Sequence, residues 1–296
     1  MKKQAKPKKT KVLSVPKVQS TEIVASYSGK IATGRFENCS PFFSLKEVWT
    51  GQLDDTEISI RQKQLSVLCS DKFNECEQRE LVAKIQEDRK DIRFYQVENE
   101  SYPSVTSVIN WDNDFEESTK HISPDDMRQY AARGTIIHAQ VFRFLKTGEW
   151  VDPKDIPELY LYRIILKKGS LGLSMEGYDF RKFYEKYKFD TINTECFVCN
   201  KTYRYAGRYD IKGVLDGVVT LFDIKTGSSI NKANCFKQLS AYAKGAGNED
   251  VAQLVVIPLN NTTKQGFSAP AIETDVDKYW PAFQKDREMF KERYGV

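Results

Sequence analysis

The sequence has few cysteines, only two histidines and no long apolar run. A membrane-spanning helix needs about 20 consecutive apolar residues, and no stretch approaches that length. No apolar segment follows the first lysines, as one does in a secretory signal. Six cysteines in 296 residues are too sparse for a disulfide scaffold. We therefore expect a cytoplasmic protein that does not bind a membrane.

A strongly basic composition is also missing, although the formal net charge is +4. Residues 1–17 contain seven lysines and no acid, so the rest of the chain is slightly acidic. Residues 1–20 lack hydrophobic periodicity, and we expect them to form a disordered tail that attracts phosphates. Two local basic clusters, within residues 201–212 and 225–244, either neutralise phosphates or form an ordinary solvated face.

The order of the expected elements is typical of an α/β protein. Ser123, Pro124 and two aspartates form a helix start, and Thr147-Gly148 is expected to end that helix. Residues 21–92 have no recognisable chemistry and are expected to be an accessory region, with a helix over 74–89. The main domain is therefore expected over 93–296. Its other expected helices cover 155–168, 178–187, 233–246 and 276–293, and its strands cover 93–97, 191–199, 203–215, 218–225 and 251–259.

A β-hairpin is expected where two strand-like segments flank Asp216-Gly217, the dipeptide favoured in a two-residue type I′ turn. With these two residues as the loop, Asp210 lies directly opposite Asp223. Cross-strand partners project from one face about 5 Å apart. Lys225 shares this face because strand side chains alternate with a period of two.

Two carboxylates held this close repel each other unless a cation lies between them. A single Asp-x-Lys is common on the solvent face of antiparallel strands. Here, however, Asp223-Ile224-Lys225 ends an apolar strand and precedes Thr226-Gly227, a setting in which functional groups collect. The pattern predicts a divalent-metal phosphodiesterase site.

Three polar residues on expected helices are candidates for the same site. His138 faces inward on its helix and is either a satisfied core histidine or a metal ligand. Gln238 and Tyr242 are four residues apart and share a helix face. They are either ordinary polar residues or groups that hydrogen-bond a phosphate or Lys225.

Two other features are less directly placed. With a two-residue turn at Asn200-Lys201, Glu195 would share the face of Asp210 but lie about 13 Å further along the strand. Cys196 and Cys199 would project to opposite faces, and a second closely spaced pair is missing. We therefore expect no iron–sulfur cluster.

Taken in order, these residues resemble the RecB-like branch of the PD-(D/E)xK nuclease superfamily. The closer resemblance is to the mitochondrial genome maintenance exonuclease and its phage-encoded relatives, and it covers residues 93–259. The motifs are Pro103–Thr106, Gly134–His138, Glu195 before Gly207–Asp210, Asp223-x-Lys225 and Gln238-x-x-x-Tyr242. The resemblance implies a mixed central sheet flanked by helices and a requirement for Mg²⁺ or Mn²⁺. If the gene is phage-encoded, the compartment is the host cytoplasm.

The resemblance and the site chemistry together imply roles for these residues. Asp210, Asp223, His138 and the carbonyl of Ile224 would hold the metal. Lys225 would position the attacking water or offset charge on the phosphate.

The surrounding residues would act on the substrate. Glu195 would lie outside the metal ligands, and Gln238 and Tyr242 would orient the substrate or Lys225. The residues implied to contact DNA are Ser104, Thr106, Arg208, Gln238 and Tyr242.

The function implied is a metal-dependent exonuclease that prefers single-stranded DNA ends and serves DNA replication, recombination or repair. Replication or recombination proteins are its expected partners. An endonuclease on the same fold remains open, because the site chemistry does not encode recognition of an end. A non-catalytic DNA-binding subunit also remains open, although such a module has no need of a lysine two residues from a metal ligand.

Overall fold

The computed structural model describes most of the chain. The described residues are 20–28, 31–32, 38–39, 42–50, 54–113, 119–171, 173, 175, 178–227, 229–260 and 263–296. They form two compact units, Met1–Leu81 and Val82–Val296. The lysine tail expected over residues 1–20 lies outside the described residues except for Ser20.

The first unit pairs two long strands antiparallel, with Ser20 opposite Thr50 and Ser28 opposite Phe42. Ile23 and Ala25 pack against Leu65 and Cys69 to form its small core. Its strands are β1 (Ser20–Ser28), β2 (Ile31–Ala32), β3 (Asn38–Cys39) and β4 (Phe42–Thr50).

Helix α1 (Asp55–Asp88) is much longer than the helix expected over 74–89. Its first half does contain buried residues at helical spacing, Leu65 and Cys69. Ile60 and Val67 on the same half are more than 50% exposed. These exposed apolar side chains obscure the amphipathic pattern, so the sequence did not predict the first five turns.

The second unit is built on a five-stranded mixed sheet in the order β11-β10-β9-β8-β7. Strands β9 and β10 are parallel, and the other neighbours are antiparallel. The α/β class expected from the sequence is confirmed. The strands are β7 (Asp190–Asn200), β8 (Tyr205–Leu215), β9 (Val218–Lys225), β10 (Gln253–Pro258) and β11 (Ala271–Glu273).

The helices of this unit begin and end close to the expected positions. Ser123 caps α4 by accepting a hydrogen bond from the amide of Asp126, and Gly148 ends it at φ 76°. No helix in the described residues is long and apolar enough to cross a membrane. The helices are α4 (Pro124–Thr147), α5 (Tyr160–Lys168), α6 (Phe180–Tyr187), α7 (Lys232–Ala243) and α8 (Trp280–Tyr294), with 3-10 turns at Pro153–Asp155 and Pro157–Leu159.

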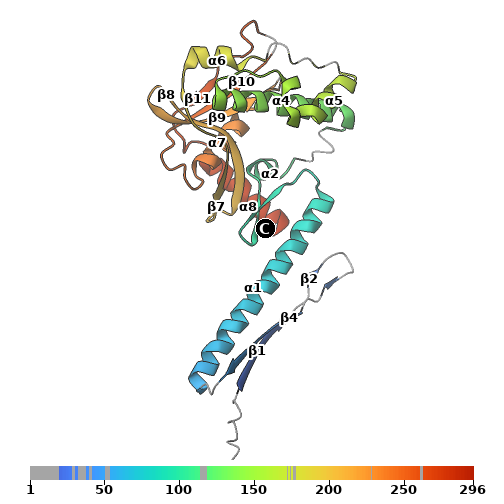
Figure 1. Cartoon of the computed structure of the whole chain (residues 1–296), viewed down its shortest axis with the longest axis vertical. Coiled ribbons are helices and arrows are strands. Elements are labelled where there is room, and N and C mark those ends of the chain that lie inside the picture. Colours follow the sequence, from blue (N-terminus) through green and yellow to red (C-terminus); the bar gives the residue numbers. More distant parts are fainter. Residues whose placement is uncertain are drawn as a thin grey trace, which may run out of the picture. The chain divides into compact units, whose positions relative to one another are not determined.

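Helices lie on both sides of the sheet. The largest core places Ile137 of α4 and Phe183 of α6 against Ile211, Phe222 and other sheet residues. Helix α7 also contacts the sheet, because its Ala241 carbonyl accepts a hydrogen bond from the hydroxyl of Tyr205 in β8. Figure 1 shows α4 and α6 toward one side of the sheet and α7 toward the other.

The turn between β8 and β9 sets the register of the hairpin. Asp216 and Gly217 have φ angles of 52° and 79°, which are the positive values that a type I′ turn requires. The ladder pairs Leu215 with Val218 and continues to Ile211 opposite Phe222. The predicted register is therefore confirmed along this ladder.

The segment from Tyr102 to Ile109 changes conformation at Ser104. Strand β6 (Glu100–Pro103) pairs with β5 (Phe94–Val97), and Ser104 caps the short helix α2 (Val105–Ile109) by accepting from the amide of Ser107. Ser104 also forms a parallel bridge with Ala206 of β8. This bridge places Ser104 beside the strand that carries Asp210.

Candidate active site

A cavity of about 530 Å³ lies where β8 and β9 approach α2, α4 and α7. Nearly all of the site residues proposed from the sequence line this cavity. Its lining consists of Arg93, Tyr95, Ser104, Thr106, His138, Gly207, Arg208, Asp210, Asp223, Ile224, Lys225, Thr226, Gly227, Gln238 and Tyr242.

Asp223 is the most buried acid of the cavity, with only 3% of its surface exposed. Its Oδ1 accepts hydrogen bonds from Lys225 Nζ at 2.9 Å and from Gln238 Nε2 at 3.3 Å. Its Oδ2 lies 2.7 Å from the same Nζ but accepts no hydrogen bond. Burial raises the pKa of the Asp223 carboxyl to about 6, although the charge of Lys225 lowers it.

Asp210 faces the same cavity from β8. Its Oδ2 accepts a hydrogen bond from the backbone amide of Ile224 at 2.7 Å, so the carboxylate reaches across the hairpin. Its Oδ1 lies 3.6 Å from Nδ1 of His138, an ion-pair contact longer than a good hydrogen bond. The two aspartates thus meet on one face, as the hairpin register predicted.

Lys225 is a cation at neutral pH. Burial by itself lowers the pKa of Lys225, but the charge and the hydrogen bond of Asp223 outweigh burial and raise the pKa above its usual value. The Nζ also donates to Oε1 of Gln238 at 3.3 Å. The ammonium group is therefore held in one place by two partners, and it cannot act as a general base.

Gln238 and Tyr242 lie on the face of α7 that looks toward the hairpin. Gln238 Nε2 contacts both Asp223 Oδ1 and the hydroxyl of Tyr242, each at 3.3 Å. Gln238 therefore connects the carboxylate, the lysine and the phenol. Burial raises the pKa of the Tyr242 hydroxyl well above its usual value, so this group stays protonated.

The ring of Tyr242 lies directly over Gly207 of β8. A Cβ atom at Gly207 would lie 2.5 Å from Cε1 of Tyr242, closer than real side chains approach. Gly134 of α4, by contrast, has room: its Cβ would lie 3.5 Å from Oγ1 of Thr226, an ordinary contact. The glycine at 207 is needed for this packing, and the glycine at 134 is not.

We expect Gly207→Ala to reduce the DNA cleavage predicted from the sequence roughly 10²-fold, because it displaces Tyr242 and with it Gln238. Gly134→Ala is the matched control and should keep activity, with a small gain in helix stability. Steady-state cleavage rates and melting curves of the two variants check this. Equal activities would show that the position of Tyr242 is unimportant.

His138 enters the cavity from α4, where its ring packs edge-on against Phe142. Burial lowers the pKa of His138, but contact with Asp210 and the nearby charge of Asp223 raise it above its usual value overall. The imidazole is 27% exposed, so it is neither sealed in the core nor free in solvent. Its position suits a metal ligand better than a packing residue.

We expect His138→Ala to raise the Mg²⁺ or Mn²⁺ concentration needed for half-maximal activity by about tenfold or more. His121, the other histidine, is exposed, so His121→Ala should leave this concentration unchanged. The measurement is a metal titration of the cleavage rate. A His138→Ala protein that loses only thermal stability would identify a core histidine instead.

The residues present fit a hard divalent cation. Mg²⁺ is usually held by one or two carboxylates and keeps several waters, and Asp210 and Asp223 provide these carboxylates. Asp223 Oδ2 is buried and lies 2.7 Å from the Lys225 ammonium, and a carboxylate oxygen has further lone pairs that a metal ion could use. Ile224 lines the cavity while its side chain belongs to the core, so its backbone is the part available. In the described residues, no three His, Cys, Asp or Glu side chains form a ready metal cluster.

Glu195 is the one proposed site residue that does not line the cavity. The predicted turn at Asn200-Lys201 is wrong, because residues 201–204 form the turn and Asn200 pairs with Tyr205. The pairs on either side of Glu195 place it opposite Asp210, not four residues further along. However, Glu195 has φ 52° and an exposed side chain. The usual alternation of side chains between the two faces of the strand is therefore broken at Glu195.

Most of the basic residues near the site are paired with acids. For the basic residues that form such ion pairs, the structure favours an ordinary solvated surface over a phosphate-binding cluster. Arg208 lines the cavity and is exposed, with no carboxylate partner in the described residues. The pairs are Lys201–Glu98, Arg204–Glu100, Lys212–Asp250, Lys237–Asp286 and Lys244–Asp277.

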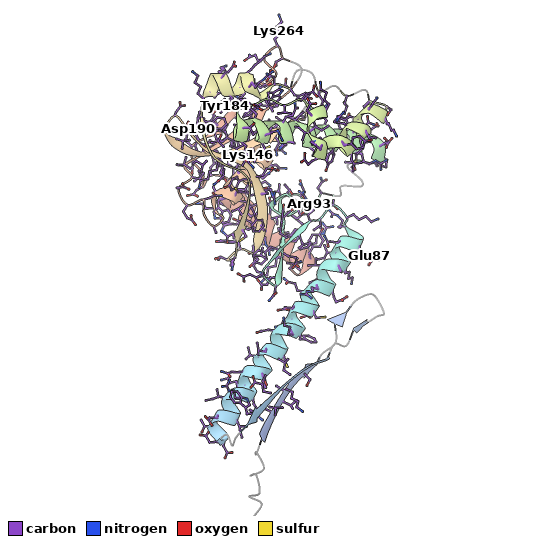
Figure 2. All side chains as sticks on the ribbon, in the orientation of Figure 1. Glu87, Arg93, Lys146, Tyr184, Asp190 and Lys264 are labelled. Atoms are coloured by element: carbon purple, nitrogen blue, oxygen red, sulfur yellow. The ribbon has the colours of Figure 1, made fainter. Side chains whose placement is uncertain are left out.

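The cavity also contains a group that the sequence did not indicate, Arg93. Figure 2 labels this residue, which immediately precedes β5. Its guanidinium donates to Oγ1 of Thr106 at 2.7 Å, and its amide donates to Ser107 Oγ at 2.8 Å. Thr106 Oγ1 is in turn 3.1 Å from the hydroxyl of Ser104. Arg93 therefore places a cation beside the two hydroxyls proposed to contact DNA.

No family model and no curated protein matches this chain. Among solved structures, the crystal structure of SSO0001 is similar, with 15% identity over 71% of this chain and 85% of that one. The TM-score is 0.31, which is too low to support a conclusion about fold or function.

Proposed function

We propose that the second unit is a RecB-like PD-(D/E)xK nuclease domain and that the protein is a metal-dependent exonuclease acting on single-stranded DNA ends. The observation that supports this most strongly is the convergence of Asp210, Asp223 and Lys225 in one cavity. A buried carboxylate paired with an ammonium and close to a second carboxylate has little structural value. It is suited to holding a cation against a phosphate.

The residues that would hold the metal are Asp210, Asp223, His138 and the Ile224 carbonyl. When bound, Mg²⁺ or Mn²⁺ would polarise a phosphate oxygen and lower the pKa of a coordinated water.

The chain's own groups have separate tasks. Lys225 remains protonated and offsets negative charge on the phosphate as it becomes pentavalent. Gln238 keeps that ammonium aligned with Asp223, because it hydrogen-bonds both groups. Arg208 and Arg93 line the same cavity and would attract neighbouring phosphates. The hydroxyls of Ser104 and Thr106 would hydrogen-bond the backbone of the strand.

The direct test uses a labelled single strand of DNA in linear and in circular form, with Mg²⁺ or with EDTA. An exonuclease degrades only the linear strand and only with Mg²⁺. Cleavage of the circle would identify the endonuclease. Binding of both forms without cleavage under any divalent cation would identify a DNA-binding subunit.

A further inference from the structure

The cavity that contains Asp210, Asp223 and Lys225 is called the catalytic cavity, and two further cavities continue from it along α2 and α7. The first, of about 330 Å³, is called the connecting cavity here; the second, of about 550 Å³, is called the outer cavity. Each shares lining residues with the one before it, so the three form a series. The catalytic and connecting cavities share Thr106, Lys225, Gly227 and Gln238, and the connecting and outer cavities share Ile109, Asn110 and Asn234.

The connecting cavity is lined by amides and hydroxyls, with Lys225 as its charged group. No carboxylate appears in its lining among the described residues, so a phosphate passing through it would meet no repulsion there. Amide and hydroxyl groups can also hydrogen-bond both bases and phosphates. The polar residues of this lining are Thr106, Asn110, Lys225, Ser229, Asn231, Asn234 and Gln238.

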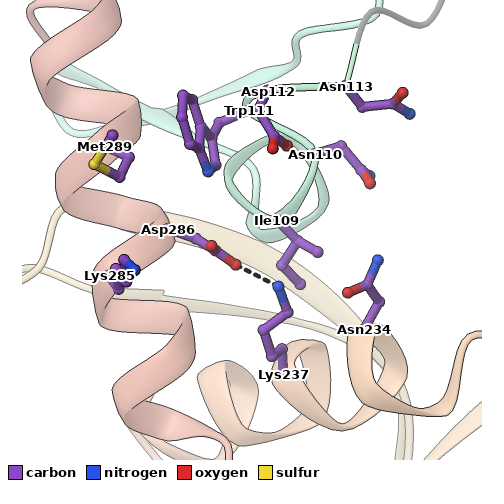
Figure 3. A pocket seen from close by; sticks show the side chains of 10 residues that line it. All are labelled: Ile109, Asn110, Trp111, Asp112, Asn113, Asn234, Lys237, Lys285, Asp286 and Met289. Atoms are coloured by element: carbon purple, nitrogen blue, oxygen red, sulfur yellow. Dashed lines mark hydrogen bonds and ion pairs between the residues drawn. The ribbon is translucent and has the colours of Figure 1, made fainter.

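The outer cavity has an aromatic wall. Trp111 follows the end of α2 and is only partly buried. In the described part of the chain, its ring stacks on no other aromatic side chain, and its Nε1 has no hydrogen-bond partner. Figure 3 shows Trp111 beside Met289 of α8, with Asn110 and Asn234 pointing toward one another across the cavity.

The charges of the outer cavity are nearly balanced. Asp286 forms an ion pair with Lys237 at 2.5 Å, which the dashed line in Figure 3 marks. Exposed Lys285 and exposed Asp112 also line it. The cavity is thus not a simple anion site. Its distinguishing features are the indole of Trp111 and three asparagines, Asn110, Asn113 and Asn234.

We infer that a single strand of DNA leaves the catalytic cavity between α2 and α7, and that one of its bases stacks on Trp111 in the outer cavity. This inference rests on the proposed nuclease function. Stacking on an aromatic side chain requires an unpaired base, because a base within a duplex is already stacked. The path therefore also favours single-stranded over double-stranded substrates.

A strand that runs from the catalytic cavity to the outer cavity should bind the protein with an affinity that depends on its length. A short oligonucleotide fills the catalytic cavity alone, whereas a longer one also reaches Trp111. We test this with oligothymidylates of about 4 to about 16 nucleotides, whose binding is measured by fluorescence anisotropy in EDTA to prevent cleavage. Longer strands should bind the parent protein more tightly, with a step where the strand reaches the outer cavity.

Trp111→Ala should weaken binding of the longer strands by about 5- to 100-fold, the range expected for one stacked base. It should leave the shortest strands unaffected and so remove the step. Trp111→Phe keeps an aromatic face and should retain most of the affinity. Tyr160→Ala, which removes a 60% exposed aromatic side chain on α5, is the control and should match the parent.

Asn234→Asp is a second variant that should not damage the fold. Asn231 caps α7 and accepts a hydrogen bond from the amide of Asn234, so position 234 lies in the first turn, where an acid is favourable. The new carboxylate would repel phosphates in the connecting cavity. We expect weaker binding of long strands relative to short ones, with an unchanged or higher melting temperature.

Three outcomes would overturn the path. In the first, Trp111→Ala and Asn234→Asp both keep the length dependence of the parent. In the second, Trp111→Ala weakens all lengths equally and lowers the melting temperature, which identifies a structural tryptophan. In the third, the parent binds no single strand of any length, and then the proposed function fails together with the path.

Discussion

Asp223→Asn is expected to abolish DNA cleavage, with a fall of roughly 10³-fold or more in kcat, because it removes the charge of a proposed metal ligand. The measurement is the rate of nucleotide release at saturating Mg²⁺. Asp216→Asn is the matched control: it makes the same change on the same hairpin, but at the turn. Asn-Gly also favours the type I′ turn, so this control should keep full activity. Near-normal activity of Asp223→Asn would remove Asp223 from the site.

The same substitution should leave the metal-free protein as stable or more stable at neutral pH. The folded-state pKa of Asp223, about 6, lies above its usual value of 3.8. Folding therefore disfavours the ionised carboxylate, and this cost is present above the folded pKa and disappears as the pH falls through it. The shift is upward even though the charge of Lys225 lowers the pKa of Asp223, so asparagine avoids a net cost although it gives up the ion pair with Lys225.

Melting curves in EDTA at several pH values test this effect. The stability gain of Asp223→Asn should be largest near pH 7 and should vanish as the pH approaches 4. A variant less stable than the parent at neutral pH would show that the carboxylate stabilises the fold.

Lys225→Ala is expected to reduce kcat by roughly 10²- to 10³-fold, since one preorganised charge is lost from the reacting phosphate. Lys212→Ala is the matched control. Lys212 is also a buried lysine, 7% exposed, and it pairs with Asp250 at 2.6 Å, but it does not line the catalytic cavity. Lys225→Ala leaves the buried Asp223 without its ion pair, and Lys212→Ala removes a buried side chain that also donates to the Gly247 carbonyl. Both variants should lose stability, yet only Lys225→Ala should lose activity. Equal activities would assign Lys225 a structural role.

The hairpin shows how far local chemistry determines this site. Asp216-Gly217 allows two consecutive positive φ angles, and that turn alone sets which residues of β8 and β9 face each other. From this register the sequence predicted the pairing of Asp210 and Asp223. The period of two then placed Lys225 beside them, and its contact with Asp223 follows that prediction.

The turn before β8 could not be predicted in the same way. Residues 201–204 contain no glycine, and Arg204 adopts φ 52°. The turn is stabilised instead by Asn200, whose Oδ1 accepts a hydrogen bond from the amide of Tyr203. Glu195 likewise has a positive φ without being glycine. Nothing in the residue types signals these angles, so the placement of Glu195 was wrong.

Arg93 was missed for a different reason. It lies more than 100 residues before Asp210, and tertiary contacts bring the two segments together. The bridge between Ser104 and Ala206 aligns α2 with β8, and the backbone of Arg93 is tied to Ser104 and Ser107. A single sequence gives no signal for such long-range contacts.

The most direct measurement follows nucleotide release from a labelled linear single strand by the parent protein and by Asp223→Asn, in parallel and with Mg²⁺ or EDTA. We predict release by the parent with Mg²⁺ only, and none by the variant, although the variant remains folded. Equal release by both proteins, or none by the parent with either Mg²⁺ or Mn²⁺, would contradict the assignment of this cavity as a nuclease centre.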